Sequence, residues 1–280
     1  MQTIALTALA MLAFAGNSIL CRLALTPTDG VAIDPYSFTA IRLVAGAVTL
    51  VLLVVSSGGG LKRFTVAPIA AVSLFVYALA FSIAYVRLGA GLGALILFAT
   101  VQFTMISAGL LRGERLTPVA AGGVALALAG TAYLVAPAVA TPELSSSLMM
   151  AAAGVAWGVY SLQGQGATDP LAATASNFVA TLPLMGVAYL IASPDAFASA
   201  WGVTLAAVSG AVTSGVGYAI WYRALPALRA HAAATVQLSV PVLAALGGVA
   251  FIAEPLTLRL ALASVVILTG IYLVVRARAA

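Results

Sequence analysis

Nearly all charged side chains in this chain of 280 residues lie between long apolar segments or at their ends, and this pattern restricts the possible folds more than any single motif does. Only 7% of the residues are charged and 63% are hydrophobic, whereas about a quarter of the residues in a soluble domain carry a charge. Segments of about 20 apolar residues without period-two alternation predict membrane-spanning helices rather than a β-barrel. The sequence therefore predicts an all-α integral membrane protein.

Breaks at charges, prolines and glycine clusters divide the chain into ten apolar segments. The first segment has one property of a secretory signal peptide, because Ala13-Phe14-Ala15 resembles a cleavage site, but it lacks a basic region before its apolar part. We therefore expect ten transmembrane helices. They are predicted at approximately residues 3 to 24, 35 to 55, 66 to 86, 90 to 111, 117 to 136, 147 to 164, 170 to 192, 200 to 222, 231 to 252 and 258 to 275.

The distribution of Lys and Arg predicts the orientation, because cytoplasmic connections are enriched in positive charge. Arg22, Arg87 and Arg259 lie near segment ends on the opposite side, which also holds Asp29, Asp34, Glu143, Asp195 and Glu254. Both termini are therefore predicted to be cytoplasmic. The basic residues on the side of the N-terminus are Lys62, Arg63, Arg112, Arg115, Arg223, Arg229, Arg276 and Arg278.

The two halves of the chain resemble each other. Residues 88–117 align with residues 228–257 at an offset of 140, which is half the chain. Five segments in each half is an odd number, so residues 1–140 and 141–280 are predicted to be repeats inserted with opposite orientation. Such inverted repeats are typical of secondary transporters whose substrate site lies where the halves meet. Further matches are Asp34-Pro35 with Asp169-Pro170, Phe14–Ser18 with Trp157–Ser161, Glu114 with Glu254, and Gly130 with Gly270.

Four short motifs resemble those of the drug/metabolite transporter superfamily. They are F-A-x-N-S at residues 14–18, P-x-S-x-x-x-x-R at 35–42, G-E-x-L-T at 113–117 and W-G-x-Y at 157–160. Within the superfamily the chain looks like the EamA-type members with ten spans, most similar to amino-acid exporters of the YddG kind. Phe14 stands where the family often has Trp. The resemblance implies a carrier in the bacterial inner membrane that exports amino acids, aromatic ones among the candidates, by alternating access.

Helical spacing brings several candidate substrate-binding residues onto common faces. In the first segment Asn17 and Ser18 share a stripe with Phe14 and Cys21, and the matched stripe of the sixth segment holds Trp157 and Tyr160. Aromatic rings beside amide and hydroxyl groups suit an amphipathic solute. The alternative is ordinary helix packing, in which small and polar residues hold spans together.

Further candidates lie in the other segments. Tyr77, Phe81 and Tyr218 lie deeper and are candidate pocket residues, with helix packing as the alternative. Tyr85, Trp221 and Tyr222 lie nearer segment ends and are predicted interfacial anchors. Two buried amides, Gln102 and Gln237, need hydrogen-bond partners. Pro241 is predicted to kink the ninth segment and to free a carbonyl for solute or gating, and the alternative is a kink that serves packing alone.

Arg42 is the only charged residue well inside a predicted segment, about 12 Å from its start. One role is structural, as a donor to carbonyls of neighbouring helices or to Asp34, and the other is recognition of a substrate carboxylate. The matched position in the second half is Asn177, so the halves differ chemically here.

The sequence shows no motif of an enzyme, a cofactor site, a metal site or a nucleic-acid site. No Asp or Glu lies deep inside a predicted segment, and the single histidine, His231, lies near the start of the ninth. Because proton-driven carriers usually need an ionisable relay within the membrane, we expect facilitated diffusion or exchange of a small-molecule substrate. The alternatives are a drug or metabolite exporter of the same superfamily and a non-transporting membrane scaffold.

Overall fold

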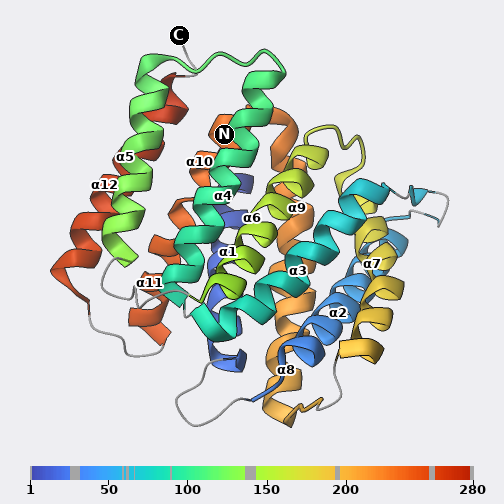
Figure 1. Ribbon diagram of the computed structural model, residues 1–280. Helices are drawn as coiled ribbons and strands as arrows, with labels where there is room; N and C mark the ends of the chain where they lie inside the picture. The colour runs from blue at the N-terminus through green and yellow to red at the C-terminus, as the bar shows by residue number, and fades with distance from the viewer. Residues whose placement is uncertain are drawn as a thin grey trace.

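The computed structural model describes residues 2–25, 32–58, 60, 63–65, 67–88, 90–135, 143–192, 196–251 and 256–277. These residues form a bundle of helices, shown in Figure 1. Each of the ten apolar segments predicted from the sequence is helical. Nine have bounds within three residues of those expected, and the eighth continues as helix to Ala227, five residues beyond its expected end. Eight of these helical stretches are long and apolar enough to cross a membrane, and Pro118–Leu134 is a shorter apolar helix. The protein is a multi-pass membrane protein.

The helices of the first half are regular. Four helices in the chain begin with proline, whose fixed φ and missing N–H suit the first turn. Asp34 caps one of them by accepting hydrogen bonds from the backbone N–H groups of Tyr36 and Ser37. The bounds are α1 (Gln2–Leu25), α2 (Pro35–Ser56), α3 (Pro68–Leu88), α4 (Ala90–Leu111) and α5 (Pro118–Val135).

Two segments of the second half are interrupted. The eighth contains a π-helix, η3, between two α-helices, and the ninth is broken at Gln237 and Leu238. Pro241 lacks the N–H that would bond to the Gln237 carbonyl, which instead accepts a hydrogen bond from Val240 N–H. The bounds are α6 (Leu144–Gly164), α7 (Pro170–Ala192), α8 (Ala200–Val208), η3 (Ser209–Val216), α9 (Gly217–Ala224), η4 (Leu225–Ala227), α10 (Ala230–Val236), α11 (Ser239–Phe251) and α12 (Leu258–Arg276).

Pro241 therefore does not free a carbonyl, and the interruption precedes it by three residues. The tetrapeptide Ala-Thr-Val-Gln occurs at 99–102 in α4 and at 234–237 where α10 ends, an offset of 135 residues. The offset of 140 expected along this pair of segments is thus not constant. Gln102 and Gln237 occupy equivalent positions in the two tetrapeptides. The predicted counterpart of Glu114, Glu254, lies outside the described residues.

Helix packing follows the same pattern in the two halves. Segments one to five of the first half are equivalent to segments six to ten of the second. The contact of the third segment (α3) with the sixth (α6) therefore corresponds to the contact of the eighth (α8, η3 and α9) with the first (α1). The contact of α4 with α6 corresponds to that of α11 with α1, and the contact of α2 with η3 corresponds to that of α7 with α3. The pairs α2 with α7, α5 with α12 and α4 with α10 each join equivalent segments.

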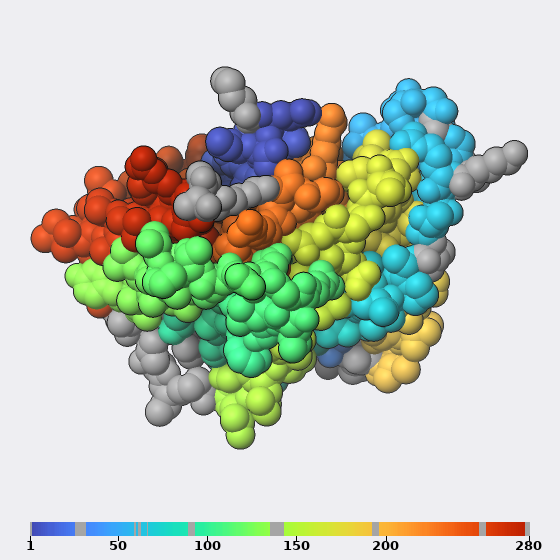
Figure 2. Space-filling view, turned by 90° about the horizontal axis from the view of Figure 1, so that it is seen from above, coloured from blue at the N-terminus to red at the C-terminus, as the bar shows by residue number. Residues whose placement is uncertain are grey.

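The pair α5 and α12 lies side by side at one edge of the bundle, which Figure 2 shows from above in green and red. Their backbones approach closely because glycines face each other: a Cβ on Gly123 would lie 2.7 Å from the Gly270 carbonyl oxygen, and a Cβ on Gly270 would lie 2.6 Å from that of Gly123. The edge pair leaves the remaining eight segments to surround the centre.

Connections from the two halves meet at the ends of the bundle. Arg63 forms an ion pair with Asp169 (Nη2–Oδ2 2.6 Å), and Arg87 forms one with Glu143 (3.0 Å). Hydrogen bonds from Ser145 and Ser146, together with Arg87, hold the pKa of the Glu143 carboxyl below its ordinary value. If ten segments cross the membrane in alternating directions, the connection that holds Arg63 lies at the same end as the one that holds Asp169. Arg87 and Glu143 likewise lie together at the other end. The start of α1 and the end of α12 also lie at one end (Figure 1).

Candidate functional site

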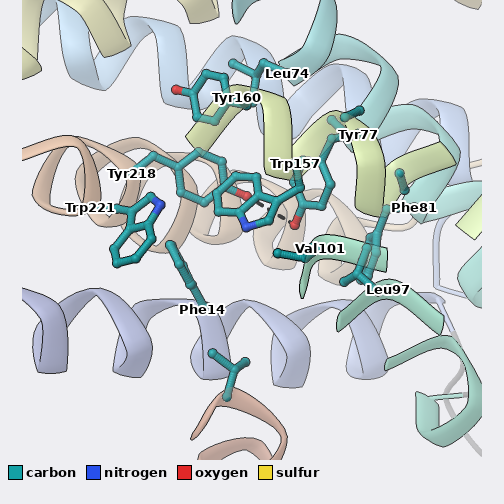
Figure 3. Packing of buried hydrophobic residues seen from close by; sticks show 14 of the residues in the cluster. Phe14, Leu74, Tyr77, Phe81, Leu97, Val101, Trp157, Tyr160, Tyr218 and Trp221 are labelled. Carbon is teal, nitrogen blue, oxygen red and sulfur yellow. Dashed lines mark hydrogen bonds between the residues drawn. The ribbon is translucent and has the colours of Figure 1, made fainter. Parts of the chain in front are cut away.

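Aromatic side chains from both halves gather at the centre of the bundle, as Figure 3 shows. Trp157 of α6 contacts four of the other rings. Its ring centroid lies 4.7 Å from that of Tyr77, 4.8 Å from that of Tyr218, 5.3 Å from that of Phe14 and 5.6 Å from that of Tyr160. Such edge and tilted arrangements are those that aromatic rings favour. We call the set Phe14, Tyr77, Trp157, Tyr160, Tyr218 and Trp221 the aromatic centre.

Arg42 of α2 reaches this centre. Its side chain is only 1% exposed. Its Nε donates to Ser214 Oγ (2.7 Å), its Nη2 donates to the Tyr218 hydroxyl (2.6 Å), and its guanidinium carbon lies 5.8 Å from the Tyr77 ring centroid. The predicted donation to Asp34 or to carbonyls is therefore wrong, because Asp34 caps α2 and the guanidinium bonds to hydroxyls of the second half.

The π-helix η3 explains how α2 comes so close to the second half. A Cβ on Gly210 would lie 2.8 Å from both Cα and C of Arg42 and closer still to its carbonyl oxygen, so only glycine fits there. A wider π-helical turn of this kind is rare and occurs frequently at functional sites. One turn later Ser214 presents its hydroxyl to Arg42. The packing of η3 against α2 therefore positions the guanidinium.

Asn17 joins η3 to α1. Its Oδ1 accepts hydrogen bonds from the hydroxyls of Ser209 (2.7 Å) and Thr213 (3.2 Å), and the side chain is buried. Ser18 does not take part, because its hydroxyl donates to the Phe14 carbonyl of its own helix. Of the two polar residues predicted in the first segment, the structure thus connects one to the elements that build the centre.

The two equivalent glutamines differ. Both heteroatoms of the Gln237 amide form hydrogen bonds: its Oε1 accepts from the Trp157 indole N–H (2.6 Å), and its Nε2 donates to the Ala233 carbonyl (3.0 Å). Gln102 is only 2% exposed, and neither atom of its amide has a hydrogen-bond partner. Buried polar groups are normally paired, so Gln102 is an unsatisfied group in α4.

The three predicted interfacial anchors are all buried. Trp221 donates its indole N–H to Ser161 Oγ (3.1 Å) and contacts Phe14, and Tyr222 packs on Tyr160 and donates to its backbone carbonyl (2.9 Å). Tyr85 packs on Phe81, which in turn contacts Tyr77. The anchor prediction is therefore wrong. Trp221 and Tyr222 belong to the same cluster as the predicted pocket residues.

Asn177, the counterpart of Arg42, also lies beside a tyrosine of α9, with its Nδ2 3.5 Å from the Tyr222 hydroxyl. The sequence did not single out Ser209, Gly210, Thr213 or Ser214. The run Ser-Gly-Ala-Val-Thr-Ser-Gly, small and polar within an apolar segment, is the signal that marks them. In the described ranges no three His, Cys, Asp or Glu side chains gather as metal ligands.

Comparison with known proteins identifies the family. The model of the EamA-like transporter family matches this chain twice, at residues 1–136 and at residues 144–276. The chain belongs to the EamA-like transporter family. It is thus a transporter of the broad drug/metabolite kind, and the family is not one of enzymes.

Two relatives and one solved structure resemble this EamA-like transporter along nearly its whole length. An uncharacterized protein of Pseudomonas aeruginosa is 49% identical over 99% of this chain and 96% of its own. An uncharacterized transporter of Archaeoglobus fulgidus is 26% identical over 88% of this chain and 90% of its own. A crystal structure, 20% identical, covers 98% of this chain and 97% of its own with a TM-score of 0.83, and it supports the fold alone.

Some buried polar atoms near the centre of this EamA-like transporter have no hydrogen-bond partner. Arg42 Nη1 and the Tyr160 hydroxyl are among them, on side chains that contact Tyr218 of the aromatic centre. Asn177 Oδ1 is a third, on a side chain that contacts Tyr222 beside the centre. An unpaired buried polar group costs about 1–3 kcal/mol, and more when it is charged. The packing around the rings therefore leaves these polar groups unsatisfied.

Proposed function

We propose that this EamA-like transporter is a secondary carrier that exports small amphipathic metabolites, with amino acids and especially aromatic ones as the first candidates, across the bacterial inner membrane. The observation that carries the proposal is the aromatic centre itself, in which rings from α1, α3, α6 and α9 pack together and two of them, Tyr77 and Tyr218, contact a buried arginine with one unpaired nitrogen. Rings suit an apolar side chain, and the free nitrogen suits a polar head group.

The proposal includes ten spans arranged as two inverted repeats, residues 1–140 and 141–280, with both termini in the cytoplasm. The two matches to one family model and the recurring contacts between equivalent segments support a duplicated architecture. The excess of Lys and Arg at one end supports the orientation. In such carriers the substrate binds where the repeats meet, and the aromatic centre lies there.

Alternating access requires one end of the bundle to open, because Arg42 and the rings around it are buried from solvent. Asp34 and Asp169, which occupy matching positions in the two halves, each join the halves at one end of the bundle. Asp34 caps α2 and also accepts from the Phe197 N–H of the second half (2.9 Å), next to the Ile33–Ala198 β-bridge. Asp169 accepts from Ala172 N–H at the start of α7 and pairs with Arg63 of the first half. We call these contacts the Asp34 clasp and the Asp169 clasp.

Locking the Asp34 clasp is expected to stop transport. Residues opposite each other in a β-bridge have Cα atoms about 4.5–5.5 Å apart, within the range of a disulfide. In a Cys21→Ala background, Ile33→Cys with Ala198→Cys should therefore cross-link under oxidation, and uptake should fall at least about tenfold and return on reduction. Each single cysteine variant is the control. Undiminished uptake by fully cross-linked protein would show that this end does not open.

The coupling we propose is facilitated diffusion or exchange. No Asp or Glu is among the buried side chains of the described ranges, and Glu114, which is partly exposed, pairs with His231 (3.0 Å) at the start of α10 rather than among the rings. In proteoliposomes, exchange of external for internal solute should be faster than net uptake driven by a pH difference. Accumulation against a gradient from an imposed pH difference alone would contradict this coupling.

The experiment that tests the function is uptake into liposomes containing the purified protein, with a panel of aromatic, aliphatic and cationic amino acids as competitors. Saturable uptake of an aromatic amino acid, absent from empty liposomes, is the expected result. The alternative is a drug exporter of the same superfamily, which the ring-lined centre would also accept. Uptake of an organic cation without uptake of any amino acid would favour that alternative.

A further inference from the structure

Arg42 carries a charge that the surrounding protein does not neutralise. Its side chain is 1% exposed, and its two bonded nitrogens donate to the neutral hydroxyls of Ser214 and Tyr218. No Asp or Glu is among the buried side chains of the described residues, so none of them supplies a buried counter-ion. An uncompensated buried charge is unfavourable by several kcal/mol. The third nitrogen, Nη1, has no hydrogen-bond partner.

We infer that Arg42 Nη1 is the anchor for the carboxylate of the substrate, and that the carboxylate rather than an ammonium group is what the site recognises. The inference rests on the proposed function, and it names the chemistry of the solute. The class is an amphipathic monocarboxylate with an aromatic or other apolar body. Every amino acid carries this carboxylate, and aromatic acids without an amino group belong to the same class.

Geometry and charge balance both favour this class. The ring of Tyr77 lies 5.8 Å from the guanidinium carbon, and Tyr77 contacts Trp157, so the unpaired charge lies beside apolar ring faces. A carboxylate bound to Nη1 makes a charge-assisted hydrogen bond and restores neutrality. A phosphate would bring a second negative charge that Arg42 alone does not balance. An amine would add positive charge beside an unpaired cation.

The probe set is 3-phenylpropionate, its uncharged amide 3-phenylpropionamide, and phenethylamine, which share one aromatic body. Calorimetric titration of the purified full-length protein should give affinities for 3-phenylpropionate about ten- to a hundredfold higher than for the amide, the range expected for a hydrogen bond to a charged group. Phenethylamine should bind no better than the amide. Equal affinities for acid and amide, or tightest binding of the amine, would overturn the inference.

Two variants assign the preference to Arg42. Arg42→Gln should reduce the ratio of acid to amide affinity to about one, whereas Arg87→Gln, which removes an exposed arginine at the end of α3, should leave the ratio unchanged. If Arg42→Gln does not fold, Ser214→Ala keeps the cation and frees Nε, and it should retain or increase the ratio. An unchanged ratio in Arg42→Gln, or loss of the ratio in Ser214→Ala, would contradict the assignment.

The titration separates this inference from the proposed function. Saturable uptake of solutes by a protein that does not distinguish acid from amide would retain the transport function and remove the carboxylate anchor. A clear preference for the acid without uptake in liposomes would retain the anchor and remove the transport function.

Discussion

Trp157→Ala is expected to lower uptake at least about tenfold per folded protein, because this side chain contacts four other rings of the centre and bonds to Gln237. Each aromatic contact is worth about 0.5–1.5 kcal/mol beyond burial, so a solute ring that packs on Trp157 loses about an order of magnitude in affinity when the indole is removed. Trp157→Phe keeps a ring but loses the indole N–H, and we expect an intermediate rate.

Trp201→Ala is the matched control for this prediction. Trp201 lies in the first turn of α8 and is 59% exposed, so its replacement changes a tryptophan without touching the centre. Uptake should be measured in proteoliposomes and divided by the amount of protein that elutes as a single folded species in size-exclusion chromatography. Wild-type uptake by Trp157→Ala, or an equal loss in Trp201→Ala, would mean that the solute does not pass through the aromatic centre.

Gly210→Ala is expected to destabilise the protein, in contrast to a methyl group added to a described glycine with open surroundings. The added Cβ would overlap the backbone of Arg42, which cannot move without shifting α2. Overpacking of this kind costs about 1–3 kcal/mol and sometimes more. The thermal unfolding midpoint of the purified protein should therefore fall, and the yield of folded protein should fall with it.

Gly186→Ala in α7 gives the matched comparison, because no atom lies within 4 Å of the added Cβ. Alanine is favoured over glycine in a helix by about 1 kcal/mol, so this variant should be as stable as the wild type or slightly more stable. If Gly210→Ala and Gly186→Ala unfold at the same temperature, η3 does not pack against α2 as closely as the structure has it.

The segment pattern of the sequence predicted the helices well, because hydropathy and length decide where a chain spans a bilayer. Trp221 shows where this reasoning fails. The eighth segment was expected to end at residue 222, but the continuous helical stretch runs from Ala200 to Ala227, so Trp221 lies deeper than expected. Its indole then meets Ser161 of α6, a contact between two segments of the same half that hydropathy does not reveal.

Arg42 shows the same limit at the site. The sequence marked it as a charge in an apolar helix and left a structural and a binding role open. Its partners are Ser214 and Tyr218, more than 170 residues away along the chain. Their positions depend on a π-helix that local sequence propensity does not predict. Helical spacing did place Trp157 and Tyr160 on one stripe of the sixth segment, and both side chains are buried.

The most direct test of the account is an experimental structure of the full-length protein with 3-phenylpropionate, or with an aromatic amino acid that it transports, bound during purification. We predict that the carboxylate lies within hydrogen-bond distance of Arg42 Nη1 and that the aromatic body lies against Trp157 and Tyr77. A solute found away from these residues, for example between α5 and α12, with the ring contacts around Trp157 intact, would contradict the account.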